Sequence, residues 1–129
     1  MKKLIDVIEG LKIGSKTKVN KTYSCKPKDK KELEKIIKER LKKDKDADLN
    51  DIDVSDITNM IYLFVDLDPH NIDISKWDVS NVINMHGMFE GCVNFNCDLS
   101  KWDVSKVEDM EWMFYMCNSL KNRPNWYKK

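Results

Sequence analysis

Several residue types on which common active sites depend are scarce in this 129-residue chain. Four glycines leave no glycine-rich loop that could hold a phosphate group. The two histidines, His70 and His86, lie in no recognisable nucleophile context with a serine or cysteine. The four cysteines include no Cys-x-x-Cys pair of the kind that binds zinc. These absences predict a protein that is not an enzyme, with no catalytic residues, no metal and no cofactor.

Long apolar runs are also missing. No stretch approaches the roughly 18 apolar residues that a membrane-spanning helix needs. The chain begins Met1-Lys2-Lys3, but Asp6, Glu9 and Lys12 interrupt the apolar stretch that a signal peptide requires. The sequence therefore predicts no signal peptide, no membrane contact and a cytoplasmic location, in a bacterium or a phage-infected host cell. In that compartment the cysteines are expected to be reduced.

What the chain does have is a repeat with a period of 25 residues. Four residue types recur at this spacing: Asp48, Asp73 and Asp98; Val54, Val79 and Val104; Met60, Met85 and Met110; Phe64, Phe89 and Phe114. A period of this length is typical of stacked repeats. The apolar positions are unevenly spaced, so we expect a short strand, a turn and a short helix in each unit, with like side chains stacked in ladders. Cys92 and Cys117 are one period apart and are expected to form a buried rung.

The sequence divides into four segments. Residues 1–25 form a basic segment with a short helix around Leu4, Ile8 and Leu11, followed by an extended arm. Residues 26–47 hold an amphipathic capping helix that begins with the capping pair Asp29 and Glu32. The repeats occupy residues 48–121 (48–72, 73–97 and 98–121), and residues 122–129 form a C-terminal cap or tail.

The third unit carries a resemblance to a known family. It reads Asp98-Leu-Ser-Lys-Trp-Asp-Val-Ser-Lys-Val-Glu-Asp-Met110, followed by Met113-Phe114-x-x-Cys117-x-x-Leu120. This string resembles the repeat of the BspA-like leucine-rich-repeat family of bacterial surface proteins, and the resemblance extends over residues 48–120. It implies an α/β repeat fold, a short right-handed leucine-rich-repeat-like solenoid of about three 25-residue units with an N-terminal α-helical cap. It also implies protein binding, since family members are linked to adhesion, and short leaderless proteins with such repeats look more like cytoplasmic or phage-borne interaction modules.

Charge is distributed very unevenly between the two parts of the chain. Residues 1–47 carry 16 Lys and Arg against 8 Asp and Glu, a net charge of +8, whereas residues 48–129 carry 7 against 14, a net charge of −7. Such a division indicates acidic or nucleic-acid partners for the first part and basic partners for the second, unless the two parts face each other. Candidate basic contacts to a nucleic acid are Lys16, Lys18, Lys21 and Lys28.

The repeated aspartates raise a second question, because Asp53, Asp78 and Asp103 would repel one another when stacked. The Asp-Val-Ser sequence predicts a local solution, in which each side chain accepts a hydrogen bond from the backbone N–H two residues on. A calcium loop starting at Asp44 is excluded, since Leu49 and Ser55 replace its glycine and glutamate. Zinc would need Cys92, Cys97, Cys117 and His86 to converge, which we do not expect.

Positions that vary between units are free to carry function, and they predict a binding surface. Candidate apolar contacts are Trp112, Tyr115, Met116, Tyr62, Trp126 and Tyr127, of which Trp126 and Tyr127 could instead cap the last unit. Candidate acidic contacts are Asp51, Asp56, Asp66, Glu90, Glu108 and Glu111. We expect a non-enzymatic protein-binding module, which could form a homodimer through its C-terminal end. The alternative is a phage or mobile-element inhibitor that blocks a host nucleic-acid-processing defence protein, by acidic mimicry of a nucleic acid.

Overall fold

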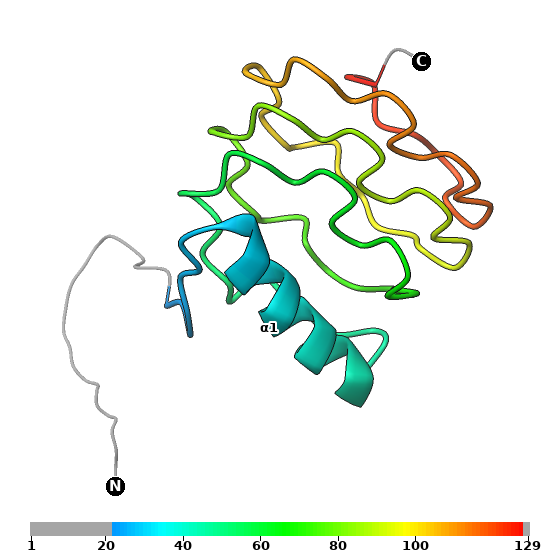
Figure 1. Ribbon diagram of the computed structural model, residues 1–129. Coiled ribbons are helices and arrows are strands. Elements are labelled where there is room, and N and C mark those ends of the chain that lie inside the picture. Colours follow the sequence, from blue (N-terminus) through cyan, green and yellow to red (C-terminus); the bar gives the residue numbers. More distant parts are fainter. Residues whose placement is uncertain (1–21, 128–129) are drawn as a thin grey trace, which may run out of the picture.

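The computed structural model describes residues 22–127 and contains one helix, α1 (Lys30–Lys43), beside a stack of irregular coils (Figure 1). The Asp29 side chain caps α1 by accepting a hydrogen bond from the backbone N–H of Glu32 at 2.9 Å. Glu32 accepts in turn from the backbone N–H of Lys28. The apolar face of α1 buries Leu33, Ile37 and Leu41 against the first coil. The predicted capping pair and the amphipathic character of this helix are confirmed.

Segments 25 residues apart lie side by side. Isolated parallel bridges join Asp48 to Asp73, Asn59 to Asn84, and Asn84 to Asp109. Backbone hydrogen bonds continue the contact between units, for example from the Met85 N–H to the carbonyl of Asp109 at 2.7 Å. Figure 1 shows the three units one above another, with α1 beside the first. The interior is therefore formed by the same positions of successive units.

The predicted fold class is wrong. In residues 22–127 there is no β-strand and no sheet, α1 is the only helix, and pairing between units is limited to isolated bridges. The structure thus does not have the α/β leucine-rich-repeat-like solenoid that the resemblance implies. The cause is local: each unit turns too often for several consecutive residues to pair as a strand. Near the Met-Phe pair, where a short helix was expected, there are turns with bonds such as Leu63 N–H to Met60 O.

Side-chain acceptors build these turns at three positions of every unit. The residues are Asp48, Asp73 and Asp98; Asp53, Asp78 and Asp103; and Asn59, Asn84 and Asp109. Each accepts from the backbone N–H two residues on, at 2.9 to 3.1 Å. The local solution predicted for the Asp-Val-Ser sequences is confirmed. Hydrogen bonds from Ser75 and Ser105 also hold the pKa values of Asp73 and Asp103 below their ordinary value.

Aromatic side chains stack through the interior in register. Phe64, Phe89 and Phe114 are stacked with ring centroids 5.1 and 5.7 Å apart. The predicted phenylalanine ladder is confirmed. A second ladder is made by indole N–H groups that reach back to carbonyl groups of the preceding unit: Trp77 to Leu49, Trp102 to Ile74, and Trp126 to Leu99. Each of these carbonyl groups also accepts a backbone bond from the N–H three residues on, so the indole bond is a second one that links successive units.

The cysteine rung is also present. Cys92 and Cys117 are buried free thiols that donate to the carbonyl oxygens of Phe64 and Phe89. Burial raises the pKa of Cys92 to about 12 and that of Cys117 to about 11. Both thiols are therefore protonated and structural, as the 25-residue spacing predicts.

Two further predictions concern the N-terminal segment and a membrane-spanning helix. The expected N-terminal helix and the residues Lys16, Lys18 and Lys21 lie outside the described residues. Within residues 22–127, the 14 residues of α1 are too few and too polar to cross a lipid bilayer.

Candidate interaction surface

Two positions in every unit have a left-handed backbone, with φ between 54° and 76° at the six residues concerned. The first position is occupied by Tyr62, Gly87 and Trp112, and the second by Asp66, Gly91 and Met116. Glycine adopts this conformation freely, whereas a residue with a Cβ atom is disfavoured by about 1–2 kcal/mol. The middle unit follows this preference at both positions. The first and third units instead hold large side chains where glycine would be more stable.

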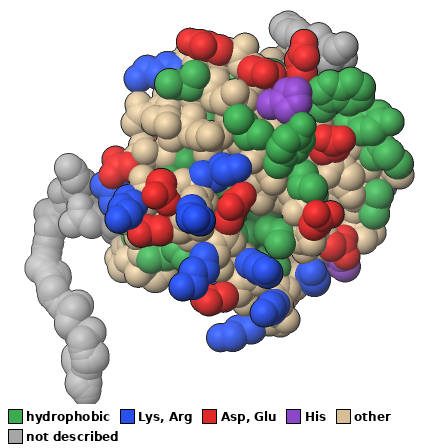
Figure 2. Space-filling model, in the orientation of Figure 1, with side chains coloured by type: hydrophobic (Ala, Val, Ile, Leu, Met, Phe, Trp, Pro, Cys, Tyr) green, Lys and Arg blue, Asp and Glu red, His purple; other side chains and the backbone are tan. Residues whose placement is uncertain are grey.

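The apolar side chains at these positions are exposed. The exposed fraction is 45% for Tyr62, 51% for Trp112 and 51% for Met116, and the neighbouring Tyr115 is 47% exposed. We call these four residues the apolar stripe. On the face drawn in Figure 2, hydrophobic side chains gather at the upper right, whereas most Lys and Arg side chains lie lower, many of them over α1. Exposed aromatic side chains held in a disfavoured backbone conformation need a reason other than folding.

Gly87 makes room for Tyr62 within the stripe. A Cβ atom at Gly87 would lie 2.3 Å from Cε1 and 2.5 Å from Cδ1 of Tyr62, so the tyrosine ring lies directly over the glycine. The edge of this ring also meets His86, with centroids 5.5 Å apart and planes at 90°. Tyr62 is therefore held in place although almost half of its surface is exposed.

A shallow pocket of about 320 Å³ lies at the third-unit end of the stripe, lined by Glu111, Trp112, Tyr115, Arg123 and Tyr127. Trp112 and Tyr115 meet edge to face with centroids 4.9 Å apart. The Arg123 guanidinium lies 5.7 Å from the centre of the Tyr127 ring. The pocket thus combines two exposed aromatic rings with one acidic and one basic side chain.

The comparison with protein families gives a match over most of the chain. A family model described as a Mycoplasma protein of unknown function, DUF285, matches residues 31–129. The chain belongs to this family. It matches no curated protein and no solved structure. Since the DUF285 description names neither a fold nor an activity, the resemblance to BspA-like repeats stays a prediction.

The C-terminal aromatics of this DUF285 chain lie against the last unit. Trp126 stacks on Trp102 with centroids 6.3 Å apart and donates to the Leu99 carbonyl at 2.9 Å. Tyr127 meets Phe114 edge to face at 5.0 Å. Trp126 therefore acts in the cap, and Tyr127 both covers the core and lines the pocket. A homodimer through this end stays a prediction.

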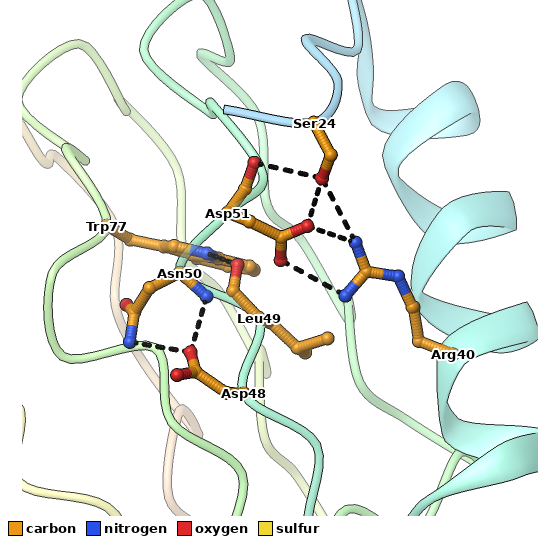
Figure 3. A network of polar contacts seen from close by, with 7 residues as sticks. All are labelled: Ser24, Arg40, Asp48, Leu49, Asn50, Asp51 and Trp77. Carbon is orange, nitrogen blue, oxygen red and sulfur yellow. Dashed lines mark hydrogen bonds and ion pairs between the residues drawn. The ribbon is translucent and has the colours of Figure 1, made fainter. Parts of the chain in front are cut away.

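The candidate acidic contacts do not behave alike. Asp51 is bound by Arg40 through both of its carboxylate oxygens, at 2.6 and 3.1 Å, and by the Ser24 hydroxyl (Figure 3). The Arg40 guanidinium holds the pKa of Asp51 below its ordinary value. Asp56 lies 3.5 Å from the Lys26 ammonium group. Two of the six acidic residues thus already have a cation as partner within the protein.

Two of the other acidic residues, Glu90 and Glu111, lie beside the stripe. Asp66 occupies a left-handed position, Glu90 has Oε1 3.1 Å from the Cβ site of Gly87, and Glu111 lines the pocket. Glu108 is exposed and follows Ile83 by one period, to which it is joined by a backbone hydrogen bond. Among the candidate basic residues, Lys28 lies 3.9 Å from Glu32 at the start of α1. The apolar stripe therefore has an acidic border.

The part of the chain from 22 to 127 also holds one group of side chains that could bind a metal ion, formed by His86, Asp109 and Glu111. Their ligand atoms all lie within 4.8 Å of one another. The zinc arrangement considered from the sequence, with three cysteines and His86, is not formed by these residues. The sequence pattern missed the observed group because its members come from two different units.

Proposed function

We propose that this protein is a non-enzymatic binding module that contacts another protein through the apolar stripe. The observation that carries the proposal is the occupation of left-handed positions by Tyr62, Trp112 and Met116, where the middle unit has glycine. These residues are not needed to satisfy the backbone, because Gly87 and Gly91 satisfy the same positions. They are also not buried in the core. Burying these exposed apolar side chains against a partner would offset the free-energy cost of the left-handed backbone.

The charge around the stripe indicates the kind of partner. Glu90 and Glu111 border it, and residues 48–129 carry a net charge of −7. A partner surface with an apolar centre and basic residues around it would complement this border. Aromatic residues at the centre would supply most of the affinity, and the border would affect the rate of association and its salt dependence.

The proposal is tested by capturing partners with the full chain from a native lysate and identifying them by mass spectrometry. Trp112→Ala and Tyr115→Ala should each remove a partner that the parent chain retains. The matched control is Tyr23→Ala, since Tyr23 is a 37% exposed tyrosine beside the first unit. If the Trp112→Ala and Tyr115→Ala variants retain every partner that the control retains, the stripe is not the binding surface.

The inhibitor that mimics a nucleic acid stays a prediction, and the same experiment separates it from the first. Mimicry requires capture to weaken strongly as salt is raised, and to be lost on charge reversal of Asp51, Asp56 and Asp66. Binding through the apolar stripe should depend on Trp112 and tolerate salt. Because Arg40 and Lys26 already pair with Asp51 and Asp56, the stripe is the better supported surface.

A further inference from the structure

A second site, next to the apolar stripe, lies between the second and third units. His86 and Glu111 occupy the same position in successive units, one period apart, and the backbone bond from the Gly87 N–H to the Glu111 carbonyl at 2.9 Å draws the two turns together. Asp109 comes from the third unit and its Oδ1 lies 3.3 Å from Nδ1 of His86. One imidazole and two carboxylates therefore converge, with all three ligand atoms within 4.8 Å of one another.

The turns themselves do not require these residues. At the position of Asp109 the first two units have Asn59 and Asn84, whose side-chain oxygens accept the same turn bond at 2.9 Å that Asp109 accepts at 3.0 Å. An asparagine is thus sufficient for the turn, and the negative charge at Asp109 is additional. At the position of His86 and Glu111 the first unit has Ile61. The departures from the repeat place three ligand side chains together.

His86 and Asp109 are oriented by contacts within the protein. The ring of His86 meets the edge of Tyr62, and Asp109 is fixed by the backbone N–H of Glu111. Among residues 22–127, neither Asp109 nor Glu111 forms an ion pair with a Lys or Arg, although Arg123 lines the same pocket as Glu111. A divalent cation would neutralise the two carboxylates while using ligands that are already oriented.

We propose that His86, Asp109 and Glu111 bind one divalent first-row transition-metal ion of the Zn²⁺ type, with water completing its coordination. An imidazole nitrogen with two carboxylate oxygens suits these ions, whereas Mg²⁺ and Ca²⁺ prefer sites formed by oxygen alone. The ion would join two units directly beside Trp112, the residue that follows Glu111 in the apolar stripe.

The test is an isothermal titration calorimetry experiment in which ZnCl₂ is added to the metal-free, untagged full chain. A single site per chain is expected, with a dissociation constant below about 100 μM, which corresponds to roughly −5.5 kcal/mol. MgCl₂ should give no saturable binding over the same range. In a parallel titration, CoCl₂ should quench tryptophan fluorescence through the neighbouring Trp112, and should show no thiolate-to-cobalt absorption band.

Conservative variants of the three ligands decide whether this group is the site. His86→Gln and Glu111→Gln should each weaken Zn²⁺ binding at least about tenfold, since each removes one of three ligands. Asp109→Asn should also weaken it while keeping its turn, because Asn59 and Asn84 make the same turn bond in the other units. The matched control is His70→Gln, which removes the other histidine of the chain and its contact with Asp68 but leaves the group intact.

The possible results either support the proposed metal site or overturn it. Binding of one Zn²⁺ that the ligand variants weaken at least about tenfold, and that the His70→Gln control does not, supports the site. Absence of saturable binding by the parent chain overturns it, and so does a loss smaller than about tenfold in His86→Gln. A thiolate-to-cobalt band would also overturn it, because it would place the ion on cysteine.

Discussion

Replacing Gly87 by alanine tests how the apolar stripe is held, because Gly87 has a close equivalent in Gly91. Both glycines have a left-handed backbone, with φ of 59° and 76°. At Gly91 an added Cβ atom meets nothing within 4 Å, whereas at Gly87 it would lie 2.3 Å from the Tyr62 ring. Gly91→Ala therefore measures the backbone cost alone, and Gly87→Ala adds displacement of Tyr62.

The expected magnitudes follow from these contacts. A left-handed alanine costs about 1–2 kcal/mol, partly offset by about 0.4–1 kcal/mol because alanine has less freedom in the unfolded chain. We expect Gly91→Ala to lower the free energy of unfolding by about 1 kcal/mol. In Gly87→Ala the tyrosine ring must also leave its edge contact with His86, worth about 0.5–1.5 kcal/mol, and lose buried area. The total for Gly87→Ala is about 2–3 kcal/mol.

The assay is urea denaturation of both variants, followed by tryptophan fluorescence. A double-mutant cycle with Tyr62→Ala isolates the ring contact, because without the ring the two alanine variants should cost about the same. If Gly87→Ala costs no more than Gly91→Ala, or costs the same with and without Tyr62, the ring is not held by the glycine. The reasoning about the stripe would then be refuted.

Three further outcomes test the packing and charge of the interior. Trp102→Phe should lower the free energy of unfolding by about 0.5–1.5 kcal/mol through the lost indole bond alone, since the Ile74 carbonyl keeps its bond from the Trp77 N–H; urea denaturation measures this. Asp51→Asn should flatten the loss of stability below about pH 4. Arg40 lowers the pKa of Asp51 in the folded state, so this ion pair adds to the free energy of unfolding above the unfolded-state pKa. That stabilisation is lost as the pH falls through the folded-state pKa. The measurement is the free energy of unfolding of parent and variant at a series of acidic pH values. Cys92 should resist alkylation at pH 8 until the protein unfolds, because burial keeps it protonated, and fast labelling in the native state would contradict this; mass spectrometry after timed alkylation is the measurement.

Several features of the fold follow directly from sequence because they depend on neighbouring residues. An Asp or Asn accepts from the N–H two residues on wherever the chain turns, so Asp53, Asp78 and Asp103 could be placed correctly before the structure was known. The capping pair at the start of α1 is local in the same way. The phenylalanine ladder follows from the period alone, since equal positions of stacked units meet.

The fold class could not be obtained in this way. The resemblance implied strands and short helices, but the frequency of side-chain turns and the two left-handed positions in each unit leave only isolated bridges. Nothing about a tyrosine at position 62 or a tryptophan at position 112 predicts that its φ is positive. The glycine at the same position of the middle unit, Gly87, is the one sequence feature that could have indicated it.

The sequence by itself determined the 25-residue register, the turns that side chains close, and the positions that face the interior. Those properties arise from local hydrogen bonds and from a repeated pattern. The tertiary structure decided which varying positions meet: Tyr62 over Gly87, Trp126 on Trp102, and His86 beside Asp109. Each of these pairs joins residues roughly one period apart. Their contact therefore depends on how two units stack, which no single unit's sequence specifies.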